Sequence, residues 1–282
     1  MPELPEVEHV RQSLAALLEG QAVERVEVRL ARIVRRPGVE AFCSRLAGKR
    51  VLRVDRRGKY LLIECDDDVV LVSHLRMEGR YGIRAAGAPL EPHTHVIFHL
   101  KGGQELRYQD VRQFGTMDLL NKGELHLLPG LFELGPEPLV DEFDAFYLQR
   151  AVDGRLAPIK AVLLDQRVVA GLGNIYVDEA LFRAGIHPER QAGQLAKKDL
   201  VRLVFAIREV IEEAVQAGGS SVKSYVNGFG EPGRFQSSLR VYGRQGQPCA
   251  RCGSPIVKGR VGGRGTHVCL HCQPAPRGAS IK

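Results

Sequence analysis

Four of the six cysteines have the spacing of a zinc site. They form two Cys-x2-Cys pairs, Cys249/Cys252 and Cys269/Cys272, with sixteen residues between the pairs. Each pair can chelate from one tight turn, and four thiolates complete the tetrahedral shell of a structural Zn²⁺ and leave no position for water. Disulfides in a secreted protein are the alternative, but they need an oxidising compartment. We predict one structural zinc ion.

The basic residues are concentrated in the same part of the chain. Residues 232–282 hold nine Lys or Arg and no Asp or Glu, whereas the other 231 residues hold 31 basic and 33 acidic groups. A local excess of this kind is typical of contact with a polyanion such as DNA. A disordered basic tail is the alternative, and the cysteine pairs argue against it.

Composition narrows the class of protein. The 282 residues are enough for two domains, and 26% of them are charged. We find no apolar run long enough to span a membrane, and the acidic start Met1–Glu6 does not resemble a signal peptide. We therefore expect a cytoplasmic protein, nucleoid-associated if it binds DNA. The isolated cysteines, Cys43 and Cys65, are expected to be buried small hydrophobic residues.

The N-terminal part predicts one helix followed by a β-rich domain. Apolar residues recur on one helical face over residues 5–19, with Pro5 in the first turn and Gly20 after the last. A short helix is predicted over 39–46. Short β-branched runs separated by Gly, Asp and Pro then predict a two-layer β-sandwich. The predicted strands are 22–30, 50–54, 59–64, 69–75, 95–100 and 105–109.

The pattern changes after a Gly- and Pro-rich linker at 129–138. Helical spacing over 142–217 predicts a second, helical domain, with a glycine-containing turn at 168–174. Its clearest helices are 159–165, 175–184 and 199–217. The fold class is thus α+β. The predicted parts are a β-sandwich domain at 1–130, a helical domain with a loop at 131–235, and a zinc finger and tail at 236–282; the resemblance described next implies that the first is catalytic and the second binds DNA.

Seven motifs, in order, resemble the formamidopyrimidine-DNA glycosylase family of bifunctional glycosylase/AP lyases. They cover the chain except for about its last ten residues. The first four are Pro2-Glu3-Leu4-Pro5-Glu6-Val7-Glu8, Arg57-Gly58-Lys59, His74-Leu75-Arg76-Met77-Glu78-Gly79-Arg80 and Leu106-Arg107-Tyr108-Gln109-Asp110-Val111-Arg112-Gln113-Phe114-Gly115. The other three are Gly171-Leu172-Gly173-Asn174-Ile175-Tyr176, the two cysteine pairs, and Gly263-Arg264-Gly265-Thr266. The resemblance implies a β-sandwich, a helix–two-turn–helix domain and a β-hairpin zinc finger. It also implies excision of oxidised purines from duplex DNA.

The resemblance makes Pro2 the nucleophile and Glu3 the general acid/base. Once Met1 is removed, Pro2 is a secondary amine that is partly unprotonated at neutral pH and can attack a sugar C1′. Glu3 suits proton transfer if its surroundings raise its pKa. On the residues alone, Glu3 and Glu6 would merely favour a helix N-terminus, and we leave Glu6 with that interpretation.

Two basic residues complete the implied catalytic set. Lys59 follows Gly58 at the start of a strand, where we expect an exposed cation that meets a phosphate and assists catalysis. Arg264 lies in a Gly-Gly-Arg-Gly turn, whose glycines let the backbone approach a phosphate that the guanidinium can grip.

Three further residues match the group that fills the gap left by a flipped nucleotide. A duplex base must leave the stack before an enzyme can process it. Met77 and Phe114 would wedge the opened step, and Arg112 would pair with the orphaned base. Packing in the core is the alternative for Met77 and Phe114. Gln113 stands where the family often has a basic residue.

Phosphate contacts are expected from residues of both domains. Asn174 begins a helix after Gly171-x-Gly173, a place where side chain and backbone amides can bind an anion. Arg155, Lys160 and His93 are further candidates. His95 is expected to be structural. Residues 218–236 would form a loop that closes over the flipped base.

Two other functions stay open. An endonuclease VIII-like enzyme of the same superfamily would prefer oxidised pyrimidines, although the Pro2–Glu6 start and the Arg112/Phe114 pair favour purines. A non-catalytic zinc-finger DNA-binding protein would explain the cysteines and the basic segment, but not Pro2-Glu3 or Arg57-Gly58-Lys59. We expect damaged double-stranded DNA as the partner and a monomeric protein.

Overall fold

The computed structural model describes residues 1–221 and 225–281. The chain forms two compact units: one from Met1–Phe132 with Ala217–Arg234, the other from Glu133–Gln216 with Phe235–Lys282. The segment 217–234 thus packs with the N-terminal unit, whereas the sequence grouped it with the helical domain. The domain boundaries drawn from the sequence otherwise remain a prediction. Within the two described ranges, no helix is long and apolar enough to cross a membrane.

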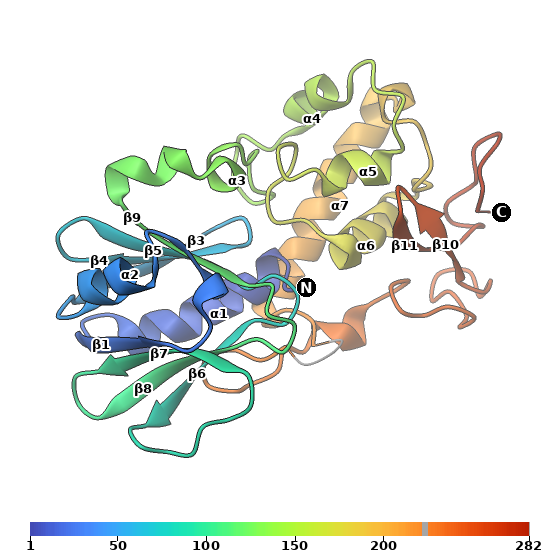
Figure 1. Cartoon of the computed structure of the whole chain (residues 1–282). Coiled ribbons are helices and arrows are strands. Elements are labelled where there is room, and N and C mark those ends of the chain that lie inside the picture. Colours follow the sequence, from blue (N-terminus) through green and yellow to red (C-terminus); the bar gives the residue numbers. More distant parts are fainter. Residues whose placement is uncertain (222–224, 282) are drawn as a thin grey trace. The chain divides into compact units, whose positions relative to one another are not determined.

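The first unit is a two-layer β-sandwich with an N-terminal helix, as predicted (Figure 1). One sheet has the order β1 (Val23–Val28), β7 (Thr94–Leu100), β8 (Gln104–Gln109), β6 (Arg80–Ala85). The other has the order β2 (Val34–Arg36), β9 (Thr116–Asn121), β5 (Val69–His74), β4 (Tyr60–Cys65), β3 (Val51–Arg57). All pairings are antiparallel except β2 with β9.

Helices of this unit follow their apolar periodicity. Helix α1 spans Leu4–Leu18, and Val7, Val10 and Leu14 on one of its faces are buried in the core that both sheets share. Helix α2 (Val39–Leu46) buries Phe42 and Leu46 in the same core. A short helix, α3 (Pro129–Phe132), ends the first stretch of the unit. Burying an apolar side chain of this size contributes roughly 1.5–3 kcal/mol.

The second unit is helical and ends in a β-hairpin. Its helices are α4 (Ala145–Val152), α5 (Ile159–Leu164), α6 (Asn174–Ala184) and α7 (Lys197–Gln216). Helix α6 packs between α5 and α7, and the antiparallel hairpin β10 (Val257–Val261) and β11 (Arg264–Val268) contacts α6. The expected fold class is therefore confirmed, including the zinc-finger hairpin.

Candidate active site and nucleic-acid interface

The N-terminal residues are held inside the first unit. Pro2 is buried, and Glu3 is 3% exposed. Glu3 forms the N-cap of α1, and its backbone N–H donates to Glu6 Oε2 at 2.7 Å. The other oxygen of Glu6 accepts a hydrogen bond of 2.6 Å from the backbone N–H of Ser220. Glu6 thus joins the start of α1 to the segment 217–234, a role that the sequence interpretation missed.

A pair of glycines makes this approach possible. Gly219 has φ +79°, and a Cβ there would lie 2.8 Å from Glu6 Oε1. Only a glycine combines that backbone conformation with so close an approach. The Gly218-Gly219 pair after α7 is the one sequence signal that could have pointed to Glu6.

Polar side chains of α1 hold more of the same segment. The Tyr225 hydroxyl donates to the backbone oxygen of Glu6 at 2.8 Å and lies 3.1 Å from His9 Nδ1. Asn227 Nδ2 lies 3.0 Å from His9 Nε2. Burial raises the pKa of Tyr225 well above its usual range, so the hydroxyl keeps its proton. Of the loop expected at 218–236, residues 222–224 lie outside the described residues. Ser220, before that gap, and Tyr225, Asn227 and Gly228, after it, form hydrogen bonds with α1.

Lys59 is not in the exposed position that the sequence suggested. Gly58 (φ +57°) and Lys59 form the two-residue turn between β3 and β4, with Arg57 paired to Tyr60. A glycine with positive φ at the first turn position is typical of a tight hairpin. Lys59 is only 6% exposed, and the next residue, Tyr60, pairs with His74 of β5. A buried cation needs a polar or anionic partner, which an exposed one does not.

His74 shows the electrostatic effect of that cation. Burial, with the positive charges of Arg76, Lys59 and Arg35, lowers the pKa of His74 to about 3. Its Nδ1 accepts a hydrogen bond of 3.0 Å from the backbone N–H of Arg76, and the Tyr60 ring packs edge-on at 4.6 Å. His74 is therefore a neutral neighbour for Lys59 at every physiological pH.

The residues expected to fill the helix gap lie on two adjacent turns. Met77 is half-buried in the turn between β5 and β6, and Arg112 and Phe114 are exposed in the turn between β8 and β9. Phe114 is 54% exposed, which excludes the core-packing alternative, and the Arg112 guanidinium lies 4.9 Å from the centre of its ring.

Tyr108 brings the two turns together. Its hydroxyl would lie 2.4 Å from a Cβ at Gly79 and 1.7 Å from a Cβ at Gly115, so both turns approach the same oxygen and neither position admits a side chain. Asp110 fixes the second turn by accepting from the backbone N–H groups of Arg112 (3.1 Å) and Gly115 (2.8 Å). The arrangement presents an aromatic ring and a guanidinium to solvent on a rigid base.

The expectation that Lys160 contacts a phosphate is wrong for this structure. Lys160 is completely buried, and its Nζ pairs with Asp178 Oδ1 at 2.6 Å. The same Nζ donates to the backbone oxygen of Gly265 at 3.0 Å. The lysine faces inward because its carboxylate partner lies on α6, eighteen residues further along the chain.

The other phosphate candidates of the second unit have different surroundings. Arg155 is exposed in the connection between α4 and α5. Asn174 begins α6, directly after the N-cap Gly173, and its Nδ2 donates to the backbone oxygen of Gly265 at 2.9 Å. The Gln166 side chain holds the preceding turn by bonding Gly171 N (3.0 Å) and Leu172 O (2.8 Å).

In the first unit His93 is exposed, with φ +62°, and His95 is buried with its Nε2 2.8 Å from the backbone oxygen of Asp110. His95 is therefore structural, as expected.

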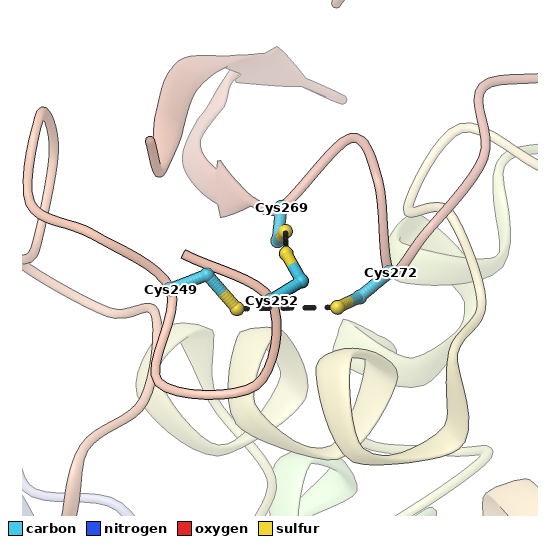
Figure 2. A group of neighbouring side chains, drawn as sticks. All are labelled: Cys249, Cys252, Cys269 and Cys272. Carbon is cyan, nitrogen blue, oxygen red and sulfur yellow. Dashed lines mark hydrogen bonds between the residues drawn. The ribbon is translucent and has the colours of Figure 1, made fainter. Parts of the chain in front are cut away.

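The four paired cysteines fit one zinc ion (Figure 2). Their Sγ atoms lie within 4.8 Å of one another, with 3.9 Å between Cys249 and Cys272 and 3.4 Å between Cys252 and Cys269. A tetrahedron with Zn–S bonds of about 2.3 Å has sulfur–sulfur edges of about 3.8 Å. Phe182, Val241 and Ile256 pack around the cluster. The site is structural, since its four protein ligands complete the shell. Of the two isolated cysteines, Cys65 is buried and Cys43 half-buried.

Arg264 is presented at the tip of the hairpin. Gly262 (φ +56°) and Gly263 (φ +76°) form a two-residue turn that pairs Val261 with Arg264, and two positive φ values are typical of a type I′ turn. The Arg264 side chain is exposed. The next residue, Gly265, accepts the hydrogen bonds from Lys160 and Asn174. The helices therefore fix the strand from which Arg264 projects.

Family models match three successive parts of the chain. Residues 1–117 match the formamidopyrimidine-DNA glycosylase N-terminal domain, residues 134–226 match the H2TH domain of the same family, and residues 246–275 match a zinc finger found in FPG and IleRS.

Known proteins match over nearly the whole chain. Formamidopyrimidine-DNA glycosylases of Brevibacillus brevis and Bacillus subtilis are 55% and 50% identical, each over 97% of this chain and 99% of the relative. A Lactococcus lactis Fpg, solved in complex with DNA containing an abasic site, superimposes with a TM-score of 0.92 at 41% identity, covering 97% of this chain and all of that one. The chain therefore belongs to the formamidopyrimidine-DNA glycosylase family and is a DNA repair glycosylase and AP lyase that binds damaged DNA.

Proposed function

We propose that this chain removes 8-oxoguanine and ring-opened purines from duplex DNA through Pro2, and then cuts the strand on both sides of the lesion. The observation that carries the proposal is the Pro2-Glu3 start. Both residues are buried at the N-terminus of α1, and Glu6 connects that point to the segment 217–234. The Lactococcus lactis protein has been solved with DNA containing Fapy-dG, a ring-opened purine.

Pro2 supplies the nucleophile once Met1 has been removed. An α-amino group with a pKa near 8 is partly unprotonated at neutral pH. Its nitrogen forms a bond to C1′ as the bond between C1′ and the damaged base breaks, and the base leaves with the electron pair. The product of ring opening is an iminium ion. Because a secondary amine leaves no N–H on that iminium, the charge stays and draws electrons from C2′.

The iminium ion then drives strand cleavage. Loss of a C2′ proton expels the 3′ phosphate, and a second elimination expels the 5′ phosphate. Water finally releases the sugar fragment and restores the amine. Glu3 is the proposed proton carrier for ring opening, since it is a carboxyl group directly next to the Pro2 nucleophile, at the N-terminus of α1.

Two cations support this chemistry in the proposal. Lys59, buried in the β3–β4 turn beside the neutral His74, assists catalysis and holds the lesion strand. Arg264, exposed at the hairpin tip, grips a phosphate in two-point fashion and assists the last elimination. When bound, zinc at Cys249, Cys252, Cys269 and Cys272 supplies only the fixed shape of the finger.

The remaining residues are proposed to hold the DNA. Met77 and Phe114 fill the opened step while Arg112 faces the orphaned base, which fits the exposure of the stacked Arg112–Phe114 pair. His93, Arg155 and the N-terminus of α6 at Asn174 contact phosphates. Lys160 is excluded from this group by its burial. We further propose that the protein acts as a monomer in the cytoplasm, in association with the nucleoid.

An excision assay with two lesions tests this proposal. One oligonucleotide duplex carries a single 8-oxoguanine and a second, of the same sequence, carries an oxidised pyrimidine. We expect faster release of the purine and products of cleavage on both sides of it. The pyrimidine arm is included because the Lactococcus lactis protein has also been solved with DNA containing an oxidised pyrimidine. Faster pyrimidine release would favour the endonuclease VIII-like function, and no cleavage of either duplex would favour a non-catalytic DNA-binding protein.

A further inference from the structure

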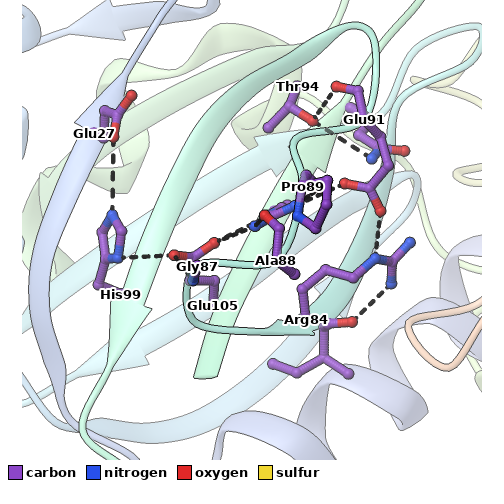
Figure 3. A network of polar contacts seen from close by, with 12 residues as sticks. Glu27, Arg84, Gly87, Ala88, Pro89, Glu91, Thr94, His99 and Glu105 are labelled. Atoms are coloured by element: carbon purple, nitrogen blue, oxygen red, sulfur yellow. Dashed lines mark hydrogen bonds and ion pairs between the residues drawn. The ribbon is translucent and has the colours of Figure 1, made fainter. Parts of the chain in front are cut away.

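Arg107 occupies an unusual place in the β1-β7-β8-β6 sheet. Side chains alternate along β8, and Leu106 and Tyr108 are buried in the core between the sheets. Arg107 therefore points to the opposite, outer face, where an arginine is ordinarily solvated. It is nevertheless only 1% exposed, because residues 86–93, the connection from β6 to β7, bond to it through Ala88 and Pro89. Figure 3 shows these two residues together with Glu91 and Glu105.

The guanidinium uses all of its hydrogen-bonding capacity on this connection and on one carboxylate. Nη1 donates to the backbone oxygen of Pro89 (2.8 Å) and to Glu91 Oε2 (2.9 Å). Nη2 donates to the backbone oxygen of Ala88 (2.7 Å) and to Glu105 Oε2 (2.6 Å), and Nε also donates to Glu105 (2.8 Å). A guanidinium has five N–H groups, so none is left for another ligand.

Glu91 links Arg107 to the end of the connection, next to β7. Its side chain pairs with Arg107 and with Arg84, and its backbone oxygen accepts from the Thr94 hydroxyl at 2.8 Å. His93 lies between these anchored residues, exposed and in the left-handed region at φ +62°. A residue that is not glycine keeps such a conformation only where its neighbours hold it.

The other side of His93 is fixed by the turn that presents Arg112. The backbone N–H of Asp110 donates to the backbone oxygen of His93 at 3.1 Å. The Asp110 carboxylate in turn holds the backbone of Arg112. The position of His93 is thus determined jointly by Arg107, through Glu91, and by the turn after β8.

We propose that Arg107 is a positioning residue that holds residues 86–93 so that His93 meets a backbone phosphate of bound DNA. This inference rests on the proposed function. Without the guanidinium, the Glu91 and Glu105 carboxylates would lose the cation that they share, and Glu91 would keep only its pair with Arg84. The backbone oxygens of Ala88 and Pro89 would also lose their donor. The connection would then have to be ordered when DNA binds, which weakens binding and leaves the chemical step unchanged.

A double-mutant cycle between Arg107→Met and His93→Ala tests the proposal. We would measure the Kd for a duplex with a stable abasic-site analogue, and kcat and KM for 8-oxoguanine release. Each single variant should weaken binding about 3- to 10-fold and raise KM with kcat unchanged. The Kd of the double variant should be no higher than the higher of the two single-variant Kd values, since both changes remove the same contact. Glu91→Ala, which keeps the Arg107 contacts to Glu105 and the backbone, gives a second cycle if Arg107→Met fails to fold.

Arg84→Ala is the matched control. Arg84 pairs with the same Glu91 carboxylate but is more exposed, and it contacts no backbone oxygen of residues 86–93. Its Kd should stay within about two-fold of the wild-type value. The proposal is overturned if the effects of Arg107→Met and His93→Ala multiply, or if His93→Ala leaves Kd unchanged. Either result can occur while the wild-type enzyme cleaves the lesion duplex, whereas a wild type without cleavage refutes the proposed function itself.

Discussion

At the proposed site, the surroundings of a side chain determine its hydrogen bonds and its charge, so that residues of the same type differ. Glu3 and Glu6 both carry carboxyl groups at the start of α1, yet the two oxygens of Glu6 accept hydrogen bonds from the backbone N–H groups of Glu3 and Ser220. His74 stays neutral because it is buried beside cations. The hydrogen-bond partners of the two carboxyl groups and the neutral state of His74 thus follow from their positions in the fold.

Glu3→Gln should lower the rate of base excision by about 10²- to 10⁴-fold, because the amide keeps the shape of the side chain and cannot transfer a proton. DNA binding should change little. Glu8→Gln is the matched control on the same helix, since Glu8 pairs with Arg11 and Arg56 and has no part in the proposed chemistry. Excision measured under single-turnover conditions checks this, and an unchanged rate for Glu3→Gln would contradict the role.

His74 predicts a loss of stability in mild acid. The unfolded chain binds a proton at His74 near pH 6.5, whereas the folded protein does so only near pH 3. The unfolded state therefore gains protons first, and the free energy of unfolding should fall by about 1 kcal/mol between about pH 7.5 and 5.5. His74→Gln should lose this part of the pH dependence in urea titrations. An identical pH profile for both proteins would show that His74 is not responsible.

Among the helices and strands, one buried ion pair joins three elements of the second unit. Lys160 on α5 pairs with Asp178 on α6, and the other oxygen of Asp178 accepts from the backbone N–H of His267 on β11 at 2.9 Å. Lys160 also bonds Gly265, next to Arg264. The pair therefore sets the register of the hairpin on the helices.

Lys160→Met should destabilise the protein by about 3–5 kcal/mol, because the Asp178 carboxylate would stay buried without its counter-charge. The double replacement, Lys160→Met with Asp178→Leu, should recover part of the lost stability. Lys198→Met, an exposed lysine on α7, should change stability by no more than about 0.5 kcal/mol. The three are compared by urea unfolding at constant zinc. A Lys160→Met variant as stable as the control would mean that the pair contributes little.

The sequence predicted most elements of the first unit and missed two of its longer strands. Helix α2 has the predicted bounds, since its apolar residues repeat on one face. Strand β9 was missed because Asp118 interrupts its apolar run, whereas the longer apolar run of β5 was predicted although β5 is buried to the same degree. Strand β6 was missed because Gly82 and two arginines hide an edge strand. The burial of Lys59 and Lys160 could not be predicted, since it depends on elements distant in the chain.

Over the whole chain, the residues proposed for catalysis and for DNA contact are distributed over two separately packed units. Pro2, Glu3, Lys59 and the gap-filling residues belong to the first unit, whereas the zinc finger with Arg264 belongs to the second. The excess of positive charge after residue 232 lies almost entirely in the second unit. The motifs in their order along the chain predicted the family, whereas the roles of the individual residues remain a proposal.

Removal of zinc should therefore weaken DNA binding without unfolding the β-sandwich. Cys272→Ser leaves three ligands, so we expect loss of bound zinc and at least a tenfold weaker Kd for lesion DNA. Cys43→Ser, away from the cluster, is the matched control and should keep both. Zinc content by atomic absorption and Kd by titration check the pair. Full zinc content and affinity in Cys272→Ser would refute the four-cysteine site.

The proposed mechanism depends on a covalent bond between the Pro2 nitrogen and a sugar carbon. Borohydride added during turnover of an 8-oxoguanine duplex should reduce the iminium ion and leave a stable protein–DNA adduct, which peptide mass spectrometry should locate at Pro2. A form in which Met1 is retained should give no adduct. An adduct of equal yield in that form, or one located at a lysine, would contradict the mechanism.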